Sequence, residues 1–320
     1  MLEPPTLEEI QTAADRIKGV VVRTPLVPLH TYGTEQDVFL KPEILQPITS
    51  FKLRGMFNAV ASMSEKERRK GLSTISSGNT AKALGWVAGY FGVKARSVMP
   101  DRVPASKIEA VRSYGTEPIM VTEEVLREYI FVRGWEQEPF SFIHPWHDHA
   151  FRAGNGTIGL EIITDLPEVE TVYVPVGGGG LATGVGSALE ALKPSVRVVG
   201  VEPEVCPALY ESLRAGKGVT VDRGETICDG ASVPFITDEM FPLLRRVLDD
   251  VVLVTEKVVK KTLKRIMFGN KMIVEGAGAL SVAGAIEQTQ EERGKSVCLL
   301  TGGSIGKEIL LNILNDPSLI

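Results

Sequence analysis

The sequence predicts an α/β protein with two lobes. Segments with the composition of strands alternate with helical segments along most of the chain, which indicates parallel strands joined by crossover helices. Residues 142–148 interrupt this alternation with a proline, aromatic rings and two histidines, and we interpret them as a return crossing between the lobes. Four consecutive glycines, Gly177, Gly178, Gly179 and Gly180, stand between an expected strand and an expected helix.

The expected elements follow in order along the chain. A helix begins after Thr6, where Thr6 and Glu9 have the pattern of a capping box and apolar residues recur at helical spacing. The next strand covers Val38–Pro42. Further strands are expected at 72–76, 95–99, 118–121, 171–176, 196–201, 251–254 and 296–300, with helices from Ala81, over 104–113, after 121, near 158–164, up to Leu192 and as a pair after 254.

Composition narrows the class of protein. The 320 residues are 43% hydrophobic and 23% charged, as in ordinary soluble domains, and the net charge of −5 without a basic stripe argues against nucleic-acid binding. We expect no secretory signal in the acidic, proline-bearing residues 1–10, and no apolar run is long enough to span a bilayer. Cys206, Cys228 and Cys298 are odd in number and lack metal-ligand spacing, which predicts reduced thiols and a cytoplasmic protein.

A lysine stands in an unusual place at the start of another expected helix. In Ser50-Phe51-Lys52-Leu53-Arg54-Gly55, Phe51 and Leu53 flank Lys52, and Ser50 has the side chain of a helix cap. Apolar neighbours and the positive end of the helix dipole both favour deprotonation of Lys52, and a neutral amine attacks carbonyls. The alternative is a structural lysine whose stem packs along a core helix while its ammonium reaches water.

The four glycines form the clearest anion site. Without side chains, successive backbone amides converge, and the following helix adds its free amides, so a phosphate-bearing ligand is favoured over a flexible turn. Gly177, Gly179 and Ala182, with Glu202 at the end of the next strand, also fit a dinucleotide-binding unit. An NAD-dependent dehydrogenase is therefore a rival interpretation, although it places this unit mid-chain and gives Lys52 no role.

Two further patterns suggest other sites. Residues 302–306 fit the nucleophile elbow of hydrolases, but no histidine follows Ser304 in the chain. His144, His147, Asp148 and His149 are zinc-ligand types, yet neighbouring residues rarely converge on one ion without further ligands. We predict no metal site.

Taken in order, the motifs resemble those of the fold-type II pyridoxal-phosphate enzymes, the tryptophan synthase β-like fold, and most closely the threonine/serine dehydratase and serine racemase branch. The matching segments are 50–55, Ser76-Ser77-Gly78-Asn79, 177–181, Glu275-Gly276-Ala277-Gly278 and Thr301-Gly302-Gly303, with echoes at Lys41-Pro42-Glu43, 154–161 and Asp229-Gly230. The resemblance implies pyridoxal 5'-phosphate in a cleft between a large lobe of residues 1–70 plus 147–320 and a small lobe of residues 71–146.

The resemblance also implies a role for each cofactor-binding residue. Lys52 would form the Schiff base and move the proton of the substrate α-carbon, Phe51 would cover the pyridine ring, and Asn79 would hydrogen-bond the ring hydroxyl oxygen. Gly177, Gly178, Gly179, Gly180 and Leu181 would hold the phosphate. Thr301 would face the pyridine nitrogen, where a hydroxyl does not force protonation and so suits β-elimination.

The substrate would lie against the segment 76–80. Ser77 would sit across the substrate from Lys52, as a carboxylate ligand or a second acid/base, and Ser76, Gly78, Asn79 and Thr80 would add further contacts. Here the sequence departs from the family pattern. The branch has histidine, a small residue and glutamine after Asn79, whereas this chain has Thr80-Ala81-Lys82, a pattern more similar to the hydroxyectoine-utilisation branch.

Other departures concern regulation and metals. Asn155 replaces a glutamine, and Ala208 stands where metal-using racemases have an aspartate after Glu202, which argues against a divalent site of that kind. The chain also ends soon after Thr301, so we expect no regulatory domain like that of biosynthetic threonine dehydratases.

The resulting hypothesis is an ammonia-lyase: β-elimination from a small β-hydroxy amino acid, L-threonine or L-serine, to a 2-oxo acid and ammonia. Alternatives within the fold are an amino-acid racemase and a dehydratase of a modified or larger hydroxy amino acid. Alternatives from other functional classes are the NAD-dependent dehydrogenase and a regulatory or binding protein that keeps the fold without activity. The expected partner is a small amino-acid substrate, with no nucleic acid and no membrane, and the resemblance implies a homodimer.

Overall fold

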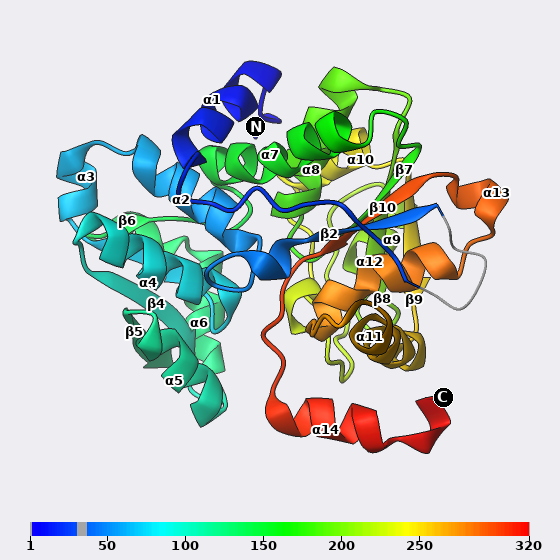
Figure 1. The fold of residues 1–320 in the computed structure, drawn as a ribbon. Helices are drawn as coiled ribbons and strands as arrows, with labels where there is room; N and C mark the ends of the chain where they lie inside the picture. Colours follow the sequence, from blue (N-terminus) through cyan, green and yellow to red (C-terminus); the bar gives the residue numbers. More distant parts are fainter. Residues whose placement is uncertain (1, 31–36, 320) are drawn as a thin grey trace.

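The computed structural model describes residues 2–30 and 37–319, and their strands form two separate sheets. In Figure 1 the two sheets lie side by side, with helices packed around each. The α/β class with parallel sheets flanked by helices is confirmed. No helix among the described residues is both long enough and apolar enough to cross a membrane.

The large sheet has six strands and is built from both ends of the chain. Its order is β1–β2–β10–β7–β8–β9, and all neighbours are parallel except β1 and β2. Strand β10 lies between β2 and β7, with Leu300 opposite Pro42 and Cys298 opposite Tyr173. The strands are β1 (Val27–Pro28), β2 (Val38–Pro42), β7 (Thr171–Pro175), β8 (Arg197–Pro203), β9 (Asp250–Val254) and β10 (Ser296–Leu300).

Both faces of the large sheet are covered, as parallel sheets require. In β7, Val172 and Val174 pack into one apolar cluster with helices α7, α8 and α10, whereas Tyr173 faces a second cluster with α11 and α12. These helices are α7 (His149–Asp165), α8 (Gly180–Leu192), α10 (Phe241–Val247), α11 (Glu256–Asn270) and α12 (Gly276–Ile286).

The small sheet comes from one continuous stretch of chain. Its parallel strands have the order β5–β4–β3–β6. They are β3 (Leu72–Ile75), β4 (Ala95–Pro100), β5 (Thr116–Val121) and β6 (Ser141–Phe142), joined by α4 (Asn79–Phe91), α5 (Ala105–Ser113) and α6 (Glu123–Phe131). The predicted lobe boundaries, 71–146 against 1–70 plus 147–320, stay a prediction.

Helix α2 (Lys52–Ser62) connects the two halves, because it packs against α4 on one side and α7 on the other. The remaining described elements lie around the two sheets. They are α1 (Leu7–Ile17), α3 (Glu65–Arg69), α9 (Ala208–Ala215), α13 (Gln290–Arg293), α14 (Lys307–Asn315) and the 3₁₀ turns η1 (Glu43–Leu45), η2 (Gly134–Gln137), η3 (Asp229–Ala231) and η4 (Pro317–Leu319).

Most predicted elements are present, and the differences have local causes. The capping box of Thr6 and Glu9 begins α1, and β2 and β10 have the predicted bounds. The helix predicted near 158–164 is much longer, because Asp148 caps it by accepting from the Phe151 amide at 2.7 Å. Residues 142–148 do return the chain from one sheet to the other, but Phe142 also ends the short strand β6, which was not predicted.

Candidate active site

Lys52 is the first residue of α2, at the end where free amides point outward. We expected Ser50 to cap this helix, but Phe51 occupies the cap position with helical backbone angles and makes no side-chain cap. The Ser50 hydroxyl still accepts from the Lys52 amide, at 3.4 Å, and donates to the Thr301 carbonyl at 3.2 Å. Ser50 therefore ties the start of α2 to the end of β10.

The environment of Lys52 favours its neutral form. Burial lowers the pKa of the amine to about 8, against a partly opposing effect of the Glu275 charge. The Lys52 Nζ lies 4.5 Å from the ring centroid of Phe51 and 5.8 Å from that of Phe151. With a pKa of about 8, roughly a tenth of the amine is neutral at pH 7, hundreds of times more than for an ordinary lysine. Lys52 is thus a nucleophilic amine held among aromatic rings.

A group of buried ion pairs holds the helix that carries Lys52. Arg54 donates in two forks, to Glu43 at 2.8 and 2.8 Å and to Glu161 at 2.7 and 2.9 Å. Lys41 Nζ donates to Glu161 at 2.6 Å and to the Thr24 carbonyl. We call Lys41, Glu43, Arg54 and Glu161 the Arg54 cluster. It joins β2, η1, α2 and α7, and so fixes the orientation of α2.

The glycine run forms a tight cradle at the start of α8. A Cβ on Gly178 would lie 2.4 Å from the Trp146 ring, and one on Gly180 would lie 2.6 Å from the Pro145 carbonyl oxygen. Gly179 has φ +91°, which side chains disfavour. The first amides of α8 have no partner within the helix. The cradle therefore offers backbone donors at a helix N-terminus, which fits a phosphate group.

The cradle and the start of α2 contribute to one buried apolar cluster. Leu181 and Phe51 belong to the same buried apolar cluster. A Cβ on Gly177 would lie 2.9 Å from the Gly230 carbonyl oxygen, and one on Gly230 would lie 3.6 Å from Glu275 Oε1. The glycine run, Lys52 and Glu275 are thus parts of one site.

Glu275, at the cap position of α12, connects the two halves of the site. Its carboxylate accepts from Asn79 Nδ2 at 2.9 and 3.1 Å and from the Ser304 amide at 3.2 Å. Burial raises the pKa of Glu275, while the Asn79 hydrogen bond and the Lys82 charge lower it in part. A Cβ on Gly302 would lie 2.5 Å from Glu275 Oε1, so a side chain there would displace this carboxylate. Sequence reasoning quoted Glu275 only as part of a motif and gave it no role.

Thr301 directly follows β10. It is 4% exposed, and its carbonyl accepts from the Phe51 amide at 3.1 Å. The next residue, Gly302, accepts from the Glu275 amide at 2.9 Å. Thr301 is therefore held between the start of α2 and the start of α12.

The predicted substrate residues share the loop between β3 and α4. Ser76 Oγ accepts from the Gly78 amide at 3.1 Å, and Thr80 is buried in the first turn of α4. Ser77 is half-buried on the same loop, which ends at Asn79. No hydrogen bond within residues 2–30 and 37–319 joins Ser77 to Lys52. The free amides at the start of α4 suit a substrate carboxylate.

The residues behind the rival interpretations have structural partners. Glu202 is 1% exposed and accepts from the Leu209 and Tyr210 amides at 2.8 and 2.9 Å, so its carboxylate holds α9. The Ser304 hydroxyl donates to Asn79 Oδ1 at 2.8 Å.

The four residues that were considered as zinc ligands also have different partners. The rings of His144 and His147 stack at 4.2 Å, His149 lies 3.0 Å from Glu9, and Asp148 caps α7. In the parts of the chain that the structure describes, no three histidine, cysteine or acidic side chains gather as a metal site would require.

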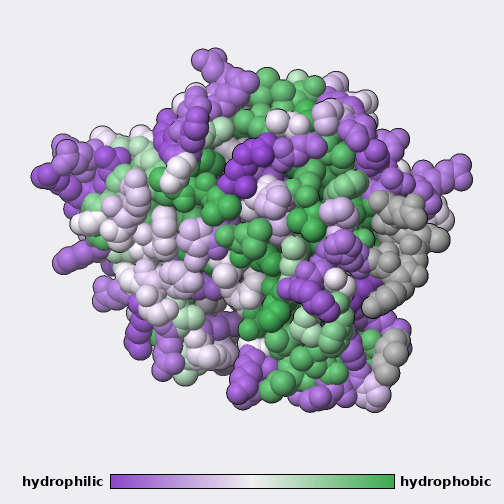
Figure 2. All heavy atoms as spheres, in the orientation of Figure 1, coloured by the Kyte–Doolittle hydropathy of each residue, from purple (hydrophilic) through white to green (hydrophobic). Residues whose placement is uncertain are grey.

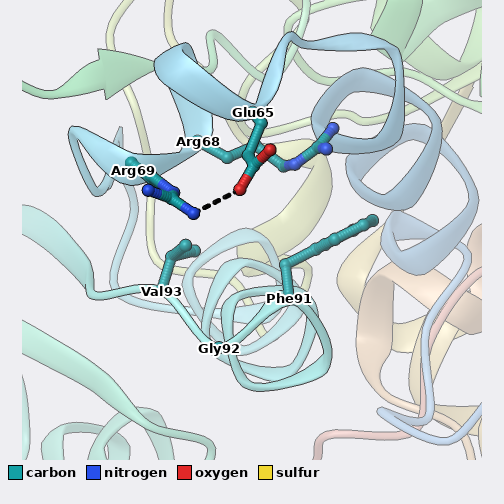
Figure 3. A pocket seen from close by; sticks show the side chains of 6 residues that line it. All are labelled: Glu65, Arg68, Arg69, Phe91, Gly92 and Val93. Carbon is teal, nitrogen blue, oxygen red and sulfur yellow. Dashed lines mark hydrogen bonds and ion pairs between the residues drawn. The ribbon is translucent and has the colours of Figure 1, made fainter.

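A cavity of about 380 Å³ lies elsewhere, between α3 and the end of α4 (Figure 3). Arg68 there stacks on the Phe91 ring at 4.9 Å and donates to the Met63 carbonyl, which closes the end of α2. Arg69 pairs with Glu65 on the surface. The two arginines that line this cavity therefore have structural partners.

The site has the parts of a cofactor site, and comparison with known proteins names the cofactor. The family model described as "Pyridoxal-phosphate dependent enzyme" matches residues 17–302.

The chain belongs to the pyridoxal-phosphate dependent enzyme family.

Relatives within this family agree on the branch. The chain is similar to the L-threonine ammonia-lyase of Thermotoga maritima, with 37% identity over 315 residues that cover 97% of this chain and 78% of the relative. It is 34% identical to the catabolic L-threonine dehydratase of Escherichia coli, covering 94% of each chain. The structure of maize serine racemase matches with a TM-score of 0.89 and 32% identity, covering 98% of this chain and 97% of that one.

These findings confirm the predicted family, fold and dependence on pyridoxal phosphate. The roles predicted for single residues stay predictions. The structure adds Glu275 and Lys82, together with the Arg54 cluster, to which the sequence had assigned no role. It also gives Ser304 a hydrogen bond to Asn79 instead of the place in a nucleophile elbow. The available signals were the motifs Lys41-Pro42-Glu43, 154–161 and 275–278. The sequence does not show which of their charged residues contact one another; only the folded structure does.

Proposed function

We propose that the protein is an ammonia-lyase that removes the β-hydroxyl group of L-threonine or L-serine and forms a 2-oxo acid and ammonia. The observation that carries this proposal is the Lys52 amine, with its pKa lowered to about 8, beside Glu275 and near the glycine cradle. The names of the relatives from Thermotoga maritima and Escherichia coli support the same reaction and substrate.

Each part of the site has a task in this reaction. The glycine cradle and the start of α8 would hold the cofactor phosphate, Phe51 would cover the pyridine ring, and Asn79 would donate to the ring hydroxyl oxygen. Thr301 would offer a neutral hydroxyl to the pyridine nitrogen. When bound, pyridoxal phosphate would supply an aldehyde for the substrate amine and a ring that withdraws electrons from the α-carbon.

Proton movement is the task of Lys52, and Ser77 helps to bind the substrate. The Lys52 amine takes the proton from the α-carbon, because its lowered pKa leaves a usable neutral fraction near pH 7. The bond from the β-carbon to oxygen breaks, and the hydroxyl takes a proton from the Lys52 ammonium formed in the first step and leaves as water. Ser77 and the amides at the start of α4 hold the substrate carboxylate. The released product hydrolyses to the 2-oxo acid and ammonia.

Replacement of Lys52 tests the proposal. The purified protein should be yellow and release ammonia from L-threonine or L-serine, and Lys52→Ala should lose both properties. Lys107→Met is a matched control, since Lys107 pairs with Asp229 at the surface and should leave both unchanged. Full turnover by Lys52→Ala would sink the proposal, and a colourless wild-type protein that binds NAD tightly would favour the dehydrogenase.

Racemisation is a second candidate function, favoured by the likeness to maize serine racemase and by Ser77 as a second acid/base. Assays of 2-oxo acid release and of enantiomer formation, run on one sample, separate the two. The pattern Thr80-Ala81-Lys82 favours a modified or larger hydroxy amino acid, which a screen of such substrates for ammonia release would reveal. A protein that is yellow but inactive on every substrate would indicate the binding-protein alternative.

We also propose a homodimer in the cytoplasm. The dimer rests on the family resemblance, and hydrophobic atoms gather over α14 at the lower side of the face in Figure 2, where Ile309 and Leu311 are exposed. The cytoplasm rests on three cysteines that are all free and buried, as expected in a reducing compartment. Analytical ultracentrifugation and cell fractionation test these two statements.

A further inference from the structure

Lys82 is a buried cation in the site that the reaction above does not use. It lies one turn after Asn79 in α4 and is 8% exposed. Its Nζ donates to the Ser304 hydroxyl and lies 5.9 Å from the Tyr114 ring centroid. Lysine is seldom buried without a partner that repays the lost hydration. The resemblance gives glutamine at this position, so the charge is a feature of this chain.

The hydrogen bonds that start at Lys82 run in one direction. An ammonium group can only donate, so the Ser304 oxygen must accept from Lys82. The Ser304 proton is then free to point to Asn79 Oδ1, at 2.8 Å. With its oxygen used in this way, Asn79 turns its NH₂ group to the Glu275 carboxylate, at 2.9 and 3.1 Å. The order from cation to carboxylate is Lys82, Ser304, Asn79, Glu275.

The other direction would require a proton on Glu275. A protonated carboxyl could donate to Asn79 Oδ1, and the amide could then turn over. The Lys82 charge opposes this, because it lowers the pKa of Glu275 against the larger effect of burial, which raises it. The ammonium therefore favours the same orientation of Asn79 through charge and through the Ser304 hydroxyl.

We propose that Lys82 is a positioning residue that acts through Ser304 to keep the NH₂ group of Asn79 as the donor available to the cofactor. This inference rests on the proposed function, which makes Asn79 the ligand of the ring hydroxyl oxygen. One proton of the NH₂ group goes to Glu275, and the second is left for that oxygen. A neutral residue at position 82 leaves Ser304 free to donate elsewhere and Asn79 free to turn.

The experiment compares Lys82→Met, Ser304→Ala and the double variant, all loaded with pyridoxal phosphate. Two readouts apply: the pH midpoint of the visible absorbance, and the dissociation constant of the cofactor. Loss of one oriented hydrogen bond should weaken cofactor binding about fivefold to tenfold in either single variant and should move the midpoint. If Lys82 acts through Ser304, the double variant should bind the cofactor no more weakly than the single variant with the lower affinity.

Two controls keep the outcomes distinct. Lys107→Met removes another lysine of the same lobe and should keep the wild-type midpoint and affinity. A wild-type protein without visible absorbance, or one whose absorbance survives Lys52→Ala, would overturn the proposed function itself. If the wild type behaves as proposed but Lys82→Met keeps its midpoint and affinity, or if the two single effects add fully in the double variant, the action of Lys82 through Ser304 is overturned while the proposed function stands.

Discussion

The molecule contains two buried groups of charges around α2, and the pKa values of their carboxyl groups shift in opposite directions. In the Arg54 cluster, burial alone would raise the pKa of Glu43, but Arg54 outweighs it and holds this pKa below its usual range. Around Glu275, burial prevails: it lowers the pKa of Lys52 to about 8 and raises that of Glu275.

The number of direct partners explains the difference. Arg54 contacts two carboxylates in paired hydrogen bonds. The carboxylate of Glu275 accepts from the Asn79 amide and the Ser304 backbone, and its interaction with Lys52 and Lys82 is electrostatic, without a hydrogen bond. Lys41 is intermediate, since burial lowers its pKa despite the Glu161 contact. Fully paired charges build a scaffold, and incompletely paired charges keep a proton that can move.

The largest expected effect comes from breaking the scaffold. Arg54→Met should lower the free energy of unfolding by about 3–5 kcal/mol, because it leaves Glu43 buried without its partner. Urea unfolding measures this loss. Arg69→Met, which removes an arginine from the exposed pair with Glu65, is the control and should cost less than about 1 kcal/mol. Equal effects of the two variants would remove the distinction between scaffold and surface pairs.

Lys52, unlike Arg54, should destabilise the folded protein when it is charged, because it is buried without a direct ion-pair partner among the described residues. Its pKa is about 8 in the folded protein and near 10.5 when unfolded, so the unfolded chain binds more protons between these values. Its contribution to stability is therefore present above pH 10.5 and is lost as pH falls through about 8. Unfolding free energies of the cofactor-free protein should rise from pH 8 to 10 relative to Lys52→Met, and parallel curves would contradict this.

Removal of the Glu275 charge should lower the pKa of Lys52 further, because that charge now raises it. Glu275→Gln keeps the size of the side chain and should speed acylation of the Lys52 amine at pH 7 several-fold, since one pKa unit corresponds to a tenfold change in neutral amine. Mass spectrometry of the labelled cofactor-free protein gives the rate. A slower rate than wild type would mean that Glu275 does not act on Lys52 through its charge.

The smallest effect should come from an exposed ion pair between α5 and η3. Lys107, in α5, lies 2.5 Å from Asp229, in η3, and both side chains are about half exposed. Lys107→Met should change the free energy of unfolding by less than about 1 kcal/mol, and added salt should reduce the difference. A loss comparable to that of Arg54→Met would show that exposure does not separate the two kinds of pair.

Local patterns in the sequence were enough for much of this description. The strands β2 and β10, the cap of α1 and the glycine run depend on residues close together in the chain, so their periodicity and turn chemistry predict them. The length of α7 was missed because its glycine-rich first half lacks a helical apolar pattern, and only the Asp148 cap marks its start.

The two groups of charges show what local patterns cannot supply. Arg54 meets Glu161 across 107 positions, and Asn79 meets Glu275 across 196. Each of these residues alone resembles an ordinary surface charge or amide. Only the packing of α2 against α7, and of the β3–α4 loop against α12, decides which charges are paired and which are left to titrate.

The position of β10 inside the large sheet also means that the two sheets are completed at different times during synthesis. All four strands of the small sheet have been synthesised by residue 142, whereas β2 and β7 lack the strand between them until residue 300. At usual elongation rates these 158 residues take roughly 8–30 s. During that time the small sheet is complete while the cofactor site is unfinished. Once residue 175 has been made, the edges of β2 and β7 stay unpaired until β10 follows.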